Sequence, residues 1–180
     1  MLHILLADGF EEIEALATLD ILRRLQIPVQ TVSIKGARQV CGAHGLTLKT
    51  DCLLRKNELR QSQGLILPGG MPGAANLNSN EAVKKILLHH HIQHTPMAAI
   101  CAAPMVLGSA GILEGRRATC YPGFEDYLKG AIIVNESVVR DDNIITAIGP
   151  AATFDFAFAI ASMFLSKERI EAEKKAMQFP

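Results

Sequence analysis

The stretch Met97-Ala98-Ala99-Ile100-Cys101-Ala102-Ala103-Pro104 decides the fold of this chain. Residues 97–100 form a short apolar run that is typical of a buried strand. Pro104 suits the first turn of a following helix, because the N–H groups of that turn have no partner within the helix. Cys101 therefore stands at the tip of a strand-turn-helix elbow. Such an elbow presses its side chain into a cleft and holds it in a sparsely populated backbone conformation.

The same alternation of strand and helix extends outward along the chain. Apolar runs and turn residues predict strands near residues 2–7, 28–34, 45–50, 64–67, 97–100, 118, 132–134 and 143–147. Helical spacing predicts helices near residues 11–25, 81–90, 102–109, 151–165 and 167–177. Parallel strands need crossover connections, and helical crossovers cover both faces of a sheet. We therefore expect a doubly wound α/β sandwich with a mostly parallel sheet.

Length and composition limit the classes of protein that fit. The 180 residues contain no linker or repeat, so we expect a single domain over residues 1–180. The 18 basic and 18 acidic residues balance, which disfavours specific nucleic-acid binding, and the longest apolar stretch, residues 156–165, is about half of a membrane span. The four cysteines show no CxxC spacing, which favours a reducing compartment and a cytoplasmic protein.

Cys101 and Glu14 are the strongest candidates for chemistry. The N–H groups at the elbow helix favour a thiolate, which predicts a Cys101 pKa below that of free cysteine, whereas the alternative is an inert core cysteine. Position alone leaves these two interpretations even. Glu14 shares a helical stripe with Ile21 and Leu25, so its carboxyl group is expected to face the core, with a raised pKa and a proton to donate to the thiolate. The alternative for Glu14 is a charge at the helix amino end, which describes Glu11 and Glu12 better.

The glycine loop after residues 64–67 is the second candidate element. Pro68-Gly69-Gly70 could be only a turn, but beside an elbow cysteine the N–H groups of Gly70 and Ala102 could form an oxyanion hole.

All six histidines precede Cys101, so a catalytic triad that needs a downstream histidine cannot be built, which disfavours a glutamine-amidotransferase-like hydrolase. His90 and His94 have zinc-compatible spacing, but a solvated helix end is favoured. We expect no metal site and no cofactor.

These residues resemble the ThiJ/PfpI superfamily, in its DJ-one/ThiJ branch. Together the matching motifs are specific and span nearly the whole chain. They are residues 7–14 (ADGFEEIE), 41–45 (CGAHG), 67–70 (LPGG), 98–104 (AAICAAP), 119–125 (TCYPGFE) and 149–150 (GP).

The resemblance implies a flavodoxin-like sandwich that forms a homodimer. It also implies that Cys101 is an oxidation-prone nucleophile, that Glu14 is its protonated partner, and that Gly70 and Ala102 are the oxyanion donors. Tyr121, His44 and Gly69 are the remaining candidates for the pocket.

The implied activity is that of a cofactor-free glyoxalase or deglycase, acting on a small aldehyde or a glycated substrate. The alternative is a redox sensor or chaperone that uses the same cysteine. Peptidase activity is disfavoured because Ala102 stands where the protease branch carries histidine, and nothing resembles a thiazole-phosphate site. Tyr121 stands where some glyoxalase-active relatives have histidine and is a poor base at neutral pH, and Ala151 replaces a second family glycine.

Overall fold

The computed structural model describes residues 1–55 and 59–179. The central strands are β1 (Leu2–Leu6), β2 (Val29–Ser33), β5 (Cys52–Leu53), β6 (Gly64–Leu67), β7 (Met97–Ile100), β10 (Val138–Asp141) and β11 (Ile144–Ala147). The helices are α1 (Glu12–Arg24), α3 (Gly73–Ser79), α4 (Glu81–Ile92), α5 (Pro104–Ser109), α6 (Thr153–Ala161) and α7 (Lys167–Ala176), with 3₁₀ turns η1 (Glu125–Tyr127) and η2 (Pro150–Ala152). Two small sheets pair β3 (Gln39–Cys41) with β4 (Thr47–Lys49), and β8 (Arg117–Ala118) with β9 (Ile132–Ile133).

The central sheet has the strand order β10-β11-β7-β6-β1-β2-β5. All neighbouring strands are parallel except β10, which runs antiparallel to β11 at the edge. The inner order β2-β1-β6-β7-β11 is that of flavodoxin-like proteins. Every residue of β1, β6, β7 and β11 is buried, because helices cover both faces of the sheet.

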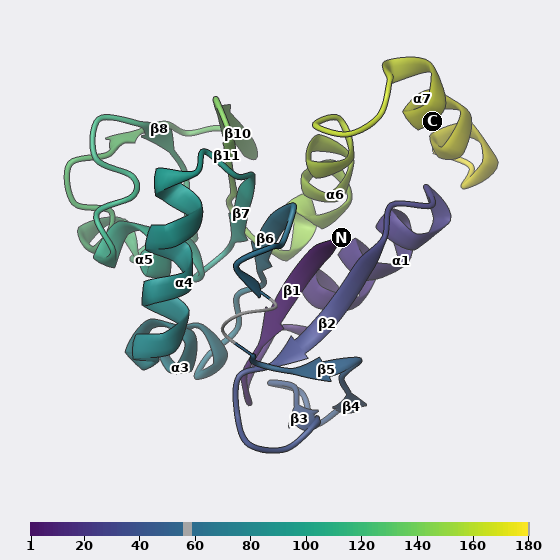
Figure 1. Cartoon of the computed structure of the whole chain (residues 1–180). Helices are drawn as coiled ribbons and strands as arrows, with labels where there is room; N and C mark the ends of the chain where they lie inside the picture. Colours follow the sequence, from purple (N-terminus) through teal and green to yellow (C-terminus); the bar gives the residue numbers. More distant parts are fainter. Residues whose placement is uncertain (56–58, 180) are drawn as a thin grey trace.

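The helices form two layers around this sheet. α1 packs against α6 on one side, and α3, α4 and α5 lie on the other (Figure 1). The chain turns from β1 outward to β2 and then returns to β6 on the opposite side of β1. This reversal creates a switch point beyond the carboxyl ends of β1 and β6, which is where ligands bind in open α/β sheets.

The predicted flavodoxin-like sandwich is confirmed, with differences at its margins. The predicted strand near residues 45–50 is present as β4, paired with β3, which the sequence patterns did not indicate. α6 ends at Ala161 rather than near residue 165, because residues 162–164 form turns. The short elements α3, β5, β10 and η1 were not predicted. No helix in the described part of the chain is long and apolar enough to cross a membrane.

Candidate active site

Cys101 lies at the tip of the predicted elbow between β7 and α5. Its φ of 62° places a non-glycine residue in the left-handed region. Its N–H donates to the carbonyl of Ala147 at 2.9 Å, and its carbonyl accepts from the N–H of Tyr121 at 2.8 Å. These two bonds tie the elbow to β11 and to the loop after β8. The residue is only 9% exposed, so the neighbouring segments enclose it almost completely.

Glu14 brings a carboxyl group from α1 to the same point. It is 1% exposed, and its Oε2 accepts the N–H of Gly69 at 2.7 Å. Its Oε1 is also buried and has no hydrogen-bond partner among the described residues. Burial raises the pKa of Glu14 to about 7, although hydrogen bonds from Gly69 and Cys101 act in the opposite direction. The prediction that Glu14 faces the core with a raised pKa is confirmed.

The glycine loop after β6 passes between these two side chains. A Cβ on Gly69 would lie 2.7 Å from Cβ of Cys101 and 2.9 Å from Oε2 of Glu14, so only glycine fits. Gly70 has a φ of +84° and packs against the backbone of Glu11. The N–H groups of Gly70 and Ala102 face the Cys101 sulfur and act to lower its pKa. The structure thus brings together Cys101, Glu14, Gly69, Gly70 and Ala102.

The prediction that the pKa of Cys101 lies below that of free cysteine is nevertheless wrong. Burial and the negative charge of Glu14 outweigh the two N–H groups and raise the pKa of Cys101 to about 12. The physical reason is twofold. The elbow buries the sulfur away from water, which disfavours the thiolate, and a carboxylate beside the sulfur disfavours a second negative charge. The thiol therefore stays protonated at neutral pH, beside a carboxyl group that itself titrates near pH 7.

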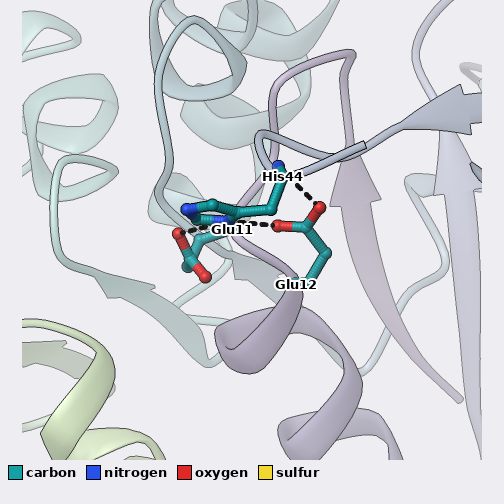
Figure 2. Close-up of side chains that lie close together, drawn as sticks. All are labelled: Glu11, Glu12 and His44. Atoms are coloured by element: carbon teal, nitrogen blue, oxygen red, sulfur yellow. Dashed lines mark hydrogen bonds and ion pairs between the residues drawn. The ribbon is translucent and has the colours of Figure 1, made fainter. Parts of the chain in front are cut away.

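Tyr121 and His44 contact different parts of the molecule. Tyr121 is 46% exposed, and its ring carbon Cδ2 would be 3.2 Å from a Cβ on Gly149. It lines a cavity of 270 Å³ with Pro122 and residues 148–151. His44 instead belongs to a turn against the start of α1, where its ring faces Glu11 and Glu12 (Figure 2).

The other histidine and cysteine candidates are separate from the pair. His90 is buried and its Nε2 bonds to the carbonyl of Leu59 at 2.7 Å, so it is not part of a solvated helix end as predicted. Burial raises the pKa of the Cys120 thiol to about 11, and the Cys41 thiol is exposed. The Glu11, Glu12 and His44 group was missed, because no local pattern indicated that residues 42–45 dock against α1.

Fold and site together define a flavodoxin-like α/β protein with a buried cysteine and glutamic acid beside its switch point. The sequence profile of the DJ-1/PfpI family matches residues 2–163. The chain belongs to this family.

Known proteins similar to this chain agree with that placement. A crystal structure of a cysteine-to-alanine mutant of a DJ-1 superfamily protein from Salmonella typhimurium superposes with a TM-score of 0.94, at 34% identity, over 99% of this chain and 98% of that one. Protein DJ-1 homolog B of Arabidopsis thaliana is 33% identical over 91% of this chain, which spans only 38% of that relative. A protein named as a deglycase from Pyrococcus abyssi is 33% identical, over 82% of this chain and 89% of its own length.

Proposed function

We propose that this protein is a cofactor-free enzyme that acts on 2-oxoaldehydes or on their adducts with amines. The observation that carries the proposal is the convergence of the Cys101 thiol, the Glu14 carboxyl group and the N–H groups of Gly70 and Ala102. A nucleophile, a proton acceptor and a pair of donors for a developing oxyanion are the parts that attack on a carbonyl requires.

The first step is attack of the Cys101 sulfur on the aldehyde carbon. The thiol proton passes to Glu14 as the C–S bond forms, since the pKa values favour a protonated thiol before the attack. The carbonyl π electrons move to oxygen, where the N–H groups of Gly70 and Ala102 stabilise the charge. Protonation of that oxygen completes a hemithioacetal.

The later steps follow from the internal redox balance of a 2-oxoaldehyde. Glu14 removes the proton from the former aldehyde carbon and a proton is returned to the neighbouring carbon. This transfer oxidises the first carbon to a thioester and reduces the second to an alcohol. Water then hydrolyses the thioester to a hydroxy acid and frees the thiol, so no external oxidant is needed. If the aldehyde arrives as an adduct, the amine leaves first.

The relatives support this class of activity. The similar protein from Pyrococcus abyssi carries the name of a deglycase. Tyr121 stands where some relatives have a histidine, and its ring is half-exposed. We therefore assign proton transfer to Glu14.

The test compares the wild-type protein with Cys101→Ala on methylglyoxal and on a methylglyoxal-treated amino acid, with loss of substrate and formation of hydroxy acid as readouts. Replacement of Cys101 should reduce turnover by roughly a thousandfold or more, because covalent catalysis disappears. The matched control is Cys41→Ala, which removes an exposed thiol and should leave the rate unchanged. Equal rates in the wild-type protein and Cys101→Ala would contradict the proposal.

The unpartnered Oε1 of Glu14 favours a second candidate, a redox sensor or chaperone without turnover. Oxidation of Cys101 by peroxide to a sulfinate would place new oxygens where this carboxyl group, when protonated, and the two N–H groups can bond to them. Peptide mass spectrometry after mild peroxide treatment should then find added oxygen on Cys101. Oxidation of Cys41 or Cys120 alone would count against this role.

Two further properties are proposed from the resemblance. We propose a homodimer, which light scattering should detect as a mass of twice 19.5 kDa; a single-chain mass at micromolar concentration would contradict it. We also propose a cytoplasmic location, in keeping with four cysteines that form no disulfide. Fractionation of the source cells tests the location.

A further inference from the structure

A second group of chemically active side chains lies where α1 begins. Glu11 and Glu12 start the helix, and His44 comes from the turn that follows β3 (Figure 2). One ligand atom from each of the three residues lies within 4.8 Å of the other two. The proposed reaction at Cys101 uses none of them.

The backbone holds this group in a fixed arrangement. Gly42 packs so closely on Glu12 that a Cβ there would lie 2.8 Å from Cγ and overlap the carboxylate. Ala43 donates its N–H to the carbonyl of Phe10 at 2.8 Å, which fastens the turn to the residue before the helix. Oε1 of Glu12 accepts the N–H of His44 at 2.8 Å, which leaves Oε2 to face the ring. The second oxygen is thus oriented in the way that outer hydrogen bonds orient metal ligands.

The spacing of the three ligand atoms suits a small cation. Nδ1 of His44 lies 2.9 Å from Oε2 of Glu12 and 3.6 Å from Oε2 of Glu11. Two ligands of a tetrahedral zinc ion, each about 2.0–2.1 Å from the metal, are roughly 3.3 Å apart. The observed distances bracket this value. A movement of the His44 ring by a few tenths of an ångström would bring both distances to this value, and the His44 side chain, which is 72% exposed, has room to move.

The charges favour a cation as well. The side chains of Glu11 and Glu12 are each only 13% exposed, and together they carry two negative charges against one positive charge at most from His44. Lys35 does not supply the difference, since it binds Asp8 at 2.6 Å. A divalent ion would neutralise both carboxylates, and a mixed imidazole and carboxylate set suits first-row transition ions.

We propose that Glu11, Glu12 and His44 form a binding site for one divalent transition-metal ion, with zinc as the probe. Three protein ligands leave at least one coordination position open, and the exposed side of His44 directs that position to solvent. The site is separate from the thiol chemistry but adjacent to it, because the N–H of Glu11 donates to the carbonyl of Gly69 at 2.9 Å.

The experiment uses the full chain with Cys41→Ala and Cys101→Ala together, which removes the exposed thiol next to the site and the active-site thiol, since either could also bind zinc. After treatment with a chelator and dialysis, zinc is titrated by calorimetry, and cobalt is titrated by absorption spectroscopy. We expect one equivalent to bind, with a cobalt spectrum that lacks a thiolate charge-transfer band. His44→Ala and Glu11→Gln should each weaken zinc binding by about tenfold or more.

The matched controls are His94→Asn and Glu81→Gln, which remove an exposed imidazole and an exposed carboxylate elsewhere and should change affinity less than about twofold. His44 is exposed, so its replacement leaves folding intact, and circular dichroism checks each variant. Absence of stoichiometric binding would overturn the proposal. So would equal affinity in His44→Ala and the controls, or a thiolate band in the cobalt spectrum.

Discussion

Glu12 and Glu14 lie two residues apart on α1, yet they face opposite environments. Glu12 accepts hydrogen bonds from the His44 ring and from the N–H groups of His44 and Leu46, and these lower its pKa although burial opposes them. Glu14 is almost completely enclosed, and burial prevails over its bonds from Gly69 and Cys101 and raises its pKa to about 7. The comparison teaches that the charge of a carboxyl group depends on a balance. Hydrogen-bond donors favour the carboxylate, and burial away from water favours the neutral acid. One helical turn therefore presents a fixed anion on one side and a titrating acid on the other.

The largest expected effect is on catalysis, where replacement of Glu14 should matter far more than replacement of Glu12. Glu14→Gln should lower kcat/KM for methylglyoxal by about a hundredfold or more, because an amide of the same shape cannot accept the thiol proton. Glu12→Gln should change this rate less than about threefold, since Glu12 faces away from the sulfur and Gln keeps an oxygen for the N–H groups. Initial rates of the three proteins at pH 8 test this. Similar losses in both variants would remove the functional difference between the two sides of α1.

Much of this contrast could be predicted from the sequence, because it depends on local spacing. The helical stripe that Glu14 shares with Ile21 and Leu25 predicts its burial, since side chains three and four apart lie on one helix face. The elbow at Cys101 is equally local: an apolar run, small residues and Pro104 in succession. The glycines at 69 and 70 were identified for the same reason, since a turn after a buried strand is visible in the sequence.

What could not be predicted depends on contacts between distant segments. The sign of the Cys101 pKa shift follows from how much water the fold excludes and from its approach to Glu14, and neither is a property of residues 97–104. The group formed by Glu12 and His44 joins residues 32 positions apart through a turn whose docking has no sequence signature. The edge strand β10 was missed because its pairing partner β11 covers only one of its sides.

The next effect concerns stability and has opposite signs for the two residues. The folded pKa of Glu14 is raised from 4.5 to about 7, so the folded state binds more protons between these values and the wild-type protein loses stability as pH rises through this window. The free energy of unfolding of Glu14→Gln, relative to that of the wild-type protein, should therefore increase by about 3 kcal/mol as the pH rises from 4.5 to 7. Glu12→Gln should instead lose stability relative to the wild-type protein at neutral pH, because the pKa of Glu12 is lowered. Urea denaturation at a series of pH values measures both, and a flat difference for Glu14→Gln would contradict its buried charge.

A smaller effect is expected on the thiol itself. The Glu14 charge is, after burial, the largest cause that raises the pKa of Cys101. Glu14→Gln should therefore lower the thiol pKa, whereas loss of a protonated Glu14 that donates to the thiolate would raise it. Ultraviolet titration of the thiolate distinguishes these directions, with Glu12→Gln as the control that should leave the value unchanged. An upward shift in Glu14→Gln would show that Glu14 acts as a proton donor when Cys101 ionises.

The smallest expected effect is on the pKa of His44, which tests the outer side of α1, where Glu11 and Glu12 face the His44 ring. The pKa of His44 is raised first by its hydrogen bond to Glu12 and then by the negative charges of Glu11 and Glu12. Glu12→Gln should lower this pKa only in part, because Glu11 remains, and the double replacement of Glu11 and Glu12 by Gln should return it to the ordinary range of an exposed histidine. NMR titration of the His44 ring in the presence of a chelator measures the two steps. If the His44 pKa does not change in either variant, the ring does not face the two carboxylates in solution. The outer side of α1 would then lack the donors that distinguish Glu12 from Glu14, and its proposed metal site would lose a ligand.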